Sequence, residues 1–116
     1  MELINMKIIT FFASILFMVF FSLGVMAGDN QLIDAIQHTQ RAVTAVDSND
    51  VVKHAEMAKN HANAAKTDKY NKFDNKQMDD GIKCLNDAIK EGKDGNAEAA
   101  RKAANDALKH FTQATN

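Results

Sequence analysis

Four stretches of this chain carry apolar residues at spacings of three and four, the period of an α-helix that buries one face. No proline interrupts them, and alanine, a strong helix former, is abundant. The expected helices run from about Gln31 to Val46, Val51 to Lys66, Asp74 or Asn75 to Gly92, and Ala97 to Ala114. The pattern therefore predicts an all-α fold with short connections.

The predicted core is unusually rich in alanine. The first and third helices bury larger residues, whereas the second and fourth bury mainly alanine. The expected buried faces are Leu32, Ile36, Thr39, Val43 and Val46; Val51, Ala55, Ala58, Ala62 and Ala65; Met78, Ile82, Leu85 and Ile89; and Ala100, Ala104, Ala107, Leu108, Phe111 and Ala114. At about 25 cal/mol per Å² of buried apolar surface, the free energy gained by burying such small side chains exceeds the entropy cost of folding only narrowly. We expect a marginally stable domain, or one helped by a ligand or by self-association.

The two halves of the helical region resemble each other. Residues 36–38 and 42–43 match residues 82–84 and 88–89 at an offset of 46, and residues 53–65 match residues 102–114 at an offset of 49. The change of offset falls in the turns. This internal repeat predicts two helical hairpins that pack as an antiparallel four-helix bundle. A dimer of hairpins or an extended array would satisfy the same pattern.

The first 27 residues differ from the rest. Lys7 precedes an 18-residue apolar run, Ile8 to Val25, and Val25 and Ala27 stand where a signal peptidase reads small side chains. We expect a signal peptide over residues 1–27 and a helical domain over residues 28–116, in the periplasm or secreted. A retained membrane anchor is the alternative, because 18 residues is near the lower limit for a spanning helix; any membrane contact would then be made by this uncleaved segment.

Charge and motifs exclude several function classes. Removing Glu2 and Lys7 keeps the net charge at −1, so no basic excess indicates nucleic acid or an anionic membrane surface as a partner. The sequence contains no Gly-rich phosphate loop, CxxC, HExxH or serine elbow. We therefore expect no catalytic residues, no bound organic cofactor and no enzymatic activity.

Histidine and cysteine are the candidate metal ligands. At 100° per residue, His38, His54, His61, Cys84 and His110 fall on the flanks of the apolar faces, where a side chain can reach a neighbouring helix while staying wet. Acidic residues precede three of these candidates by one helical turn, as Asp34 does His38, Asp80 does Cys84 and Asp106 does His110.

This donor set suits copper, nickel or zinc better than calcium or magnesium, and surface pairs predict open, labile sites. The alternative is that they are ordinary surface histidines with helix-charge partners, and that Cys84 is a small half-buried hydrophobe. Met57, one turn before His61, and Met78 are expected to be packing residues. Tyr70 and Phe73 lie in the linker from Thr67 to Asn75 and are expected to fold over the end of the bundle, with a surface patch as the alternative.

At these residues the chain resembles the small metal-binding protein family of bacterial periplasms (SmbP-like). The matching segments are residues 34–38, 53–56, 61–65, 81–90 and 103–110. The resemblance implies a secreted, histidine-rich four-helix bundle that binds copper and other divalent metals for storage or scavenging. It also implies that His38, His54, His61 and His110 are family histidines. Cys84, Glu91, Asn96 and Ala103 stand where the family tends to carry histidine, and the family's His-rich tail is missing.

Two functions are consistent with these features. The first is a periplasmic or secreted protein that binds copper, nickel or zinc weakly for scavenging or storage. Its ligands would be the four histidines and Cys84, with Asp34, Asp80 and Asp106 as auxiliary ligands or orienting groups. The second is a non-catalytic helical scaffold of the cell envelope whose metal sites have degenerated.

Overall fold

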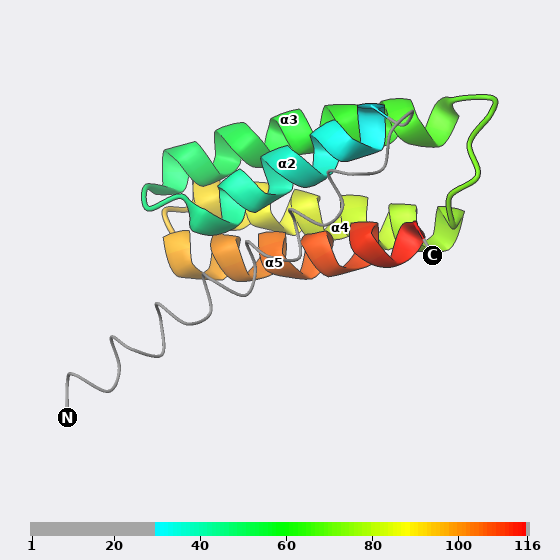
Figure 1. The fold of residues 1–116 in the computed structure, drawn as a ribbon. Coiled ribbons are helices and arrows are strands. Elements are labelled where there is room, and N and C mark those ends of the chain that lie inside the picture. The colour runs from blue at the N-terminus through cyan, green and yellow to red at the C-terminus, as the bar shows by residue number, and fades with distance from the viewer. Residues whose placement is uncertain (1–29, 116) are drawn as a thin grey trace, which may run out of the picture.

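The computed structural model describes residues 30–115, and within that range it contains helices and no strand. The predicted signal peptide, residues 1–27, lies outside the described residues, so its boundary with the domain stays a prediction. The helices are α2 (Asn30–Thr44), α3 (Ser48–Thr67), α4 (Asn75–Lys93) and α5 (Ala97–Ala114), as Figure 1 shows. The all-α prediction is confirmed, and each helix begins and ends within a few residues of its expected bounds.

The helices form an antiparallel four-helix bundle. The α2–α3 and α4–α5 hairpins are the most extensive pairings, α3 packs on α4, and α5 closes onto α2 (Figure 1). The diagonal helices α3 and α5 also touch. They can do so because both bury alanine, and small side chains let helix backbones approach closely.

The alanine-rich core forms as expected. The α3 face buries Val51, Ala55, Ala58, Ala62 and Ala65. The α5 face buries Ala100, Ala104, Ala107, Leu108, Phe111 and Ala114. Most of the larger side chains of the core come from α2, α4 and the end of α5, and Phe111 is the largest of the fully buried ones. Ile82 and Ile89 pack against this core from its margin rather than inside it.

Two expectations at helix ends were wrong. Gly92 does not stop α4: it is buried inside the helix, where a Cβ would overlap the Val52 side chain of α3. The chain turns at Gly95, which adopts a φ of 86° that glycine tolerates. Val46 lies in the turn after α2 and is 86% exposed. The Arg101 guanidinium of α5 donates hydrogen bonds to the Ala45 and Val46 carbonyls at 3.2 Å each, which ties the turn after α2 to α5.

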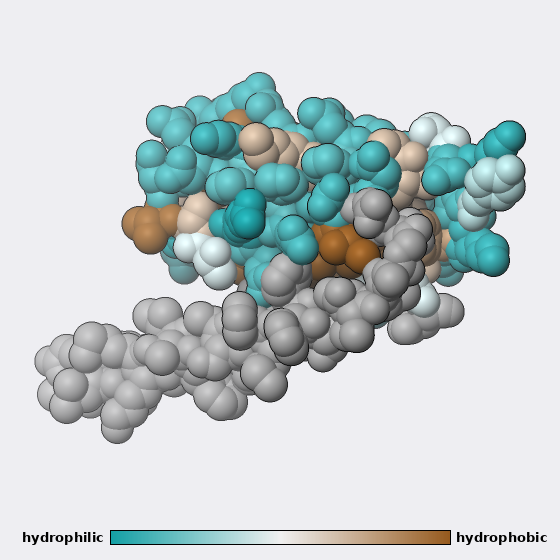
Figure 2. All heavy atoms as spheres, turned by 45° about the horizontal axis from the view of Figure 1, so that its top comes forward, coloured by the Kyte–Doolittle hydropathy of each residue, from teal (hydrophilic) through white to brown (hydrophobic). Residues whose placement is uncertain are grey.

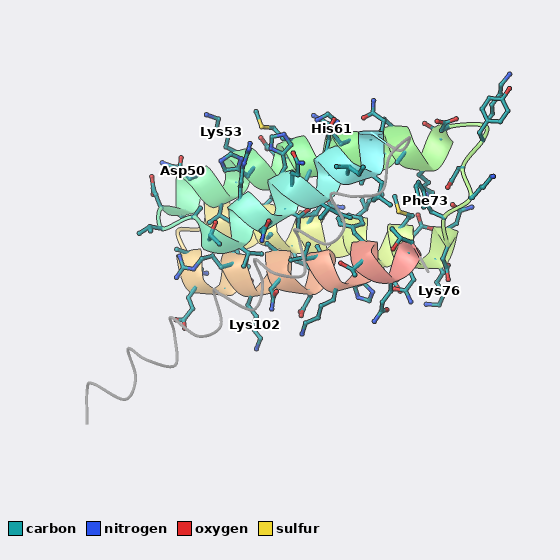
Figure 3. The ribbon with its side chains drawn as sticks, viewed as in Figure 1. Asp50, Lys53, His61, Phe73, Lys76 and Lys102 are labelled. Atoms are coloured by element: carbon teal, nitrogen blue, oxygen red, sulfur yellow. The ribbon has the colours of Figure 1, made fainter. Side chains whose placement is uncertain are left out.

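The two aromatic residues of the linker between α3 and α4 lie in different surroundings. Phe73 packs against the core from the inner side of the linker, as predicted (Figure 3). Tyr70 is 76% exposed, with the Lys69 ammonium 5.3 Å from its ring centroid, so it does not cover the bundle end. Asp74 caps α4 by accepting from the backbone N–H groups of Lys76 and Gln77. The Gln77 side chain does not turn back toward Asp74, because it reaches across to α5.

The outside of the bundle is mainly polar. Figure 2 brings the α2 and α3 side toward the viewer and shows a mostly hydrophilic surface with small hydrophobic areas. Among the helices of residues 30–115, none has the length and apolar character needed to cross a membrane.

Candidate metal centre

Three histidines from two helices meet on the outer side of the α2–α3 hairpin. The His38 ring of α2 stacks on the His61 ring of α3, with centroids 5.4 Å apart and planes inclined by 2°. It also stacks on the His54 ring of α3, with centroids 5.8 Å apart and planes inclined by 22°. Figure 3 shows His61 at the edge of the bundle over α2 and α3. We call His38, His54 and His61 the histidine trio.

The trio forms because helical angles place each ring on a flank of its helix and the hairpin brings these flanks together. His54 and His61 are two turns apart on one side of α3. His38 lies on the flank of α2 that faces them, and all three are half-buried. The antiparallel hairpin therefore places His38 between the two α3 rings, a juxtaposition that the helical angles alone do not specify.

Nitrogens of two trio rings lack hydrogen-bond partners. Nδ1 of His38 and Nδ1 of His54 are buried and have no hydrogen-bond partner. A buried polar atom without a partner is uncommon, because it has lost its hydration and gained no hydrogen bond in return. These two nitrogens therefore mark the trio as a place where a polar ligand would be stabilised.

The surroundings favour neutral imidazole. Burial lowers the pKa of His38 below its ordinary value, and the charges of His61, Arg41 and His54 add to this, against the opposing Asp34 carboxylate. Burial also lowers the pKa of His54, with Arg41 and Lys53 adding and Asp50 opposing. Neutral imidazole is the form that binds a metal ion.

His61 is oriented by acceptors on α2. Its Nδ1 lies 2.9 Å from Gln31 Oε1 and 3.9 Å from Asp34 Oδ2. The sequence pairs Asp34 with His38 of the same helix, whereas the structure brings its carboxylate to His61 of the neighbouring helix. Its charge also acts on His38, so it lies beside the trio.

The second hairpin carries fewer donors at the corresponding positions. His110 of α5 has Nδ1 2.8 Å from Gln77 Oε1 of α4. Cys84 is a half-buried free thiol. Burial raises the pKa of Cys84, and Asp106, Asp87 and Asp80 raise it further against the opposing Lys83. This thiol is therefore protonated at neutral pH and must lose a proton to bind metal.

The remaining candidates differ in their surroundings. Asp80 forms an ion pair with Lys76 at 3.2 Å, one turn earlier on α4. Asp106 is exposed on α5. Met78 is fully buried, as predicted for a packing residue, but Met57 is 39% exposed and is not one. Met57 stands on α3 between His54 and His61 in sequence, so an exposed methionine lies on a helix that carries candidate ligands.

A family comparison bears on the identity of the chain. The family model described as "Small metal-binding protein" matches residues 5–114, nearly the whole chain. The chain belongs to the small metal-binding protein family. No curated protein and no solved structure matches it. The resemblance seen in the sequence is thereby confirmed at the level of the family.

The description of the family implies metal ions as the binding partner. The trio fits such an ion by the type of its donor atoms, but its rings are not arranged to bind one ion together. Within residues 30–115, no three His, Cys, Asp or Glu side chains converge closely enough to hold one ion. Metal–nitrogen bonds of about 2.1 Å place ligand nitrogens roughly 3.4 Å apart in a tetrahedral site. Stacked rings with centroids 5.4 and 5.8 Å apart must rotate about their side-chain bonds to reach that spacing.

Acid should destabilise the metal-free fold through this cluster. An unfolded histidine titrates near its ordinary pKa of 6.5, whereas His38 and His54 titrate lower when folded, so the unfolded chain binds more protons between those values. The contribution of these histidines to the free energy of unfolding should reach its maximum above about pH 6.5 and decline as the pH falls toward the folded pKa values. Urea midpoints measured across this range should show the decline, and it should flatten in the His38→Gln/His54→Gln variant. An equal decline in the variant would assign the effect to other groups.

Two glutamines of the site were not predicted from the sequence. Gln31 and Gln77 each hold a histidine of the partner helix in their hairpin, and neither was a candidate residue. The internal repeat could have indicated them. Gln31 and Gln77 are 46 residues apart, which is the offset between the first and third helices. His61 and His110 are 49 residues apart, which is the offset between the second and fourth helices.

Proposed function

We propose that this protein binds copper, or alternatively nickel or zinc, reversibly and without catalysis, for scavenging or storage outside the cytoplasm. Membership of the small metal-binding protein family supports metal as the cargo. The export signal expected at residues 1–27 supports a periplasmic or secreted location. The choice of copper rests on imidazole-rich donors and the exposed thioether, since divalent copper outranks nickel and zinc for such ligands and thioethers suit monovalent copper.

The observation that carries this proposal is the meeting of His38, His54 and His61. Two stacked contacts bring imidazoles from α2 and α3 together at the surface, and two of their nitrogens have no hydrogen-bond partner. When these rings turn toward a common ion, their lone pairs replace part of its water shell. Because the rings are half-buried and open to solvent, exchange should be fast and binding moderate.

The other predicted ligands take secondary places in the proposal. His110 and Cys84 would offer a weaker second locus, because Cys84 must first release its proton. Asp34 would act beside the trio by orienting His61. Asp80 and Asp106 would act near Cys84, where their charges already bear on the thiol. Self-association through a shared ion is compatible with open sites.

Titration of residues 28–116 with Cu²⁺, Ni²⁺ and Zn²⁺ tests the proposal. Calorimetry should show saturable binding near pH 7.5, tightest for Cu²⁺ in the order expected for nitrogen ligands. Metal at about 100 times its dissociation constant should add about 2.7 kcal/mol to the free energy of unfolding and raise Tm. A folded domain with no binding heat and an unchanged Tm for all three ions would contradict the proposal and favour a scaffold role.

A further inference from the structure

We propose that Gln31 and Gln77 set the position of the imidazole proton on His61 and His110, and so hold Nε2 of each ring ready as a metal donor. This inference rests on the proposed function and names positioning residues for it. It gives each hairpin one oriented imidazole: His61 in the first and His110 in the second.

Each glutamine meets its histidine through one pair of atoms. Gln31 Oε1 lies 2.9 Å from His61 Nδ1, and Gln77 Oε1 lies 2.8 Å from His110 Nδ1. An amide oxygen can only accept a hydrogen bond, so Nδ1 must carry the proton in both pairs. The Asp34 carboxylate, 3.9 Å from the same nitrogen of His61, is likewise an acceptor and favours the same proton position.

The consequence concerns the other ring nitrogen. In neutral imidazole only one nitrogen carries hydrogen, so Nδ1–H leaves an unprotonated lone pair on Nε2. A free histidine side chain in water prefers the proton on Nε2, which blocks that lone pair. The glutamines therefore reverse the ordinary preference, and no proton shift between ring nitrogens is needed before Nε2 binds a metal ion. Metal-binding histidines commonly have their second nitrogen held in this way.

The arrangement occurs in both hairpins at corresponding positions. Gln31 and Gln77 both lie in the first turn of their helices, α2 and α4. His61 and His110 both lie one to two turns before the ends of α3 and α5. Gln77 is also the residue that a capping box would turn back toward Asp74, yet its side chain reaches across to α5 instead. Two such bridges, between residues 30 and 33 positions apart, make a chance contact a poor explanation.

A rival role is purely structural: each glutamine would clamp its hairpin without any effect on metal. The position of the imidazole proton distinguishes the two roles. A purely structural glutamine would affect stability alone, whereas a positioning glutamine would also determine which ring nitrogen carries the proton. The variants are Gln31→Met and Gln77→Met, which remove the acceptor, and Gln31→Glu, which keeps one. Gln113→Met on the exposed side of α5 is the matched control.

The first experiment needs no metal. Nitrogen-15 spectra of the imidazoles at about pH 8, where histidine is neutral, distinguish Nδ1–H from Nε2–H. In the unaltered chain, His61 and His110 should be mainly Nδ1–H. Gln31→Met should shift His61 toward the Nε2–H form, against the remaining Asp34 carboxylate, and leave His110 unchanged. Gln77→Met should shift His110 and leave His61 unchanged, and Gln31→Glu should keep Nδ1–H. Unchanged tautomers in both methionine variants would overturn the proposal.

The second experiment measures metal affinity by calorimetry with Cu²⁺ and Zn²⁺, with folding checked by circular dichroism. Gln31→Met should weaken binding about tenfold, Gln31→Glu should restore most of the affinity, and Gln113→Met should have no effect. Equal weakening by Gln31→Met and Gln31→Glu would overturn the positioning role. If the unaltered chain binds no metal, the proposed function fails, and so does the donor role of Nε2. The tautomer spectra would still decide whether the glutamines place the proton.

Discussion

Replacing Phe111 by alanine should cost about 3–5 kcal/mol of unfolding free energy, the range for removing a buried aromatic ring. Phe111 is fully buried and is the largest such side chain in the described core. It packs on Gly81 of α4, where a Cβ would lie 2.5 Å from the ring carbon Cε1. The alanine side chains of the core are too short to fill the cavity that the ring would leave. Since small domains are stable by only about 5–15 kcal/mol, this variant should lose a large share of its stability.

Urea denaturation followed by circular dichroism measures this loss. Tyr70→Ala is the matched control, because Tyr70 is 76% exposed and its removal should change stability by less than about 0.5 kcal/mol. Gly81→Ala probes the same contact from α4: the added methyl group meets a buried ring that has little room to move, so this variant should also be destabilised. A Phe111→Ala variant as stable as Tyr70→Ala would show that α4 and α5 do not pack as described.

Removing the histidine trio should lower affinity for Cu²⁺ by at least about 100-fold, because losing ligands must cost more than losing their orienting partners. The variant His38→Ala/His54→Ala/His61→Ala takes away every imidazole of the first hairpin. The fold should survive, since the three side chains are half-buried at the bundle margin and alanine favours helix. Calorimetry gives the affinity, and circular dichroism confirms the helices.

The matched control removes three polar side chains from the same two helices, as Gln37→Ala/Asn60→Ala/Asn63→Ala. It should bind Cu²⁺ as the unaltered chain does. Residual weak binding in the trio variant would be assigned to His110 and Cys84, and should disappear when they too are replaced. Full affinity retained without the trio would contradict the proposed centre.

The helical period predicted more of the fold than of the site. Leu32 and Leu85 fell on the buried faces because a 3.6-residue repeat is a local property of the chain. Gly92 was misread as a stop because its role depends on Val52 of another helix, which the local pattern does not contain. Val46 continued the period of α2 but came after its last turn, so it is exposed.

The same division holds at the site. The flank angles of His38, His54 and His61 follow from their positions along α2 and α3, and their half-buried state was predicted correctly. The partner of each ring was not predictable in this way. Asp34 was paired with His38 of its own helix, whereas its carboxylate reaches His61 on the adjacent helix. Gln77 was not a candidate, yet its side chain reaches His110 on α5. Spacings within one helix say nothing about the axial register between two.

By itself the sequence determined four helices, their buried faces and the flank positions of the soft donor atoms, since all of these depend on residues three or four apart. Only the tertiary structure decided that His38 lies between His54 and His61, that two glutamines hold histidines across the hairpins, and that Met57 faces solvent. Those facts depend on how neighbouring helices are placed against each other, and that placement is settled by side chains packing between helices, as Phe111 does on Gly81 and Val52 on Gly92.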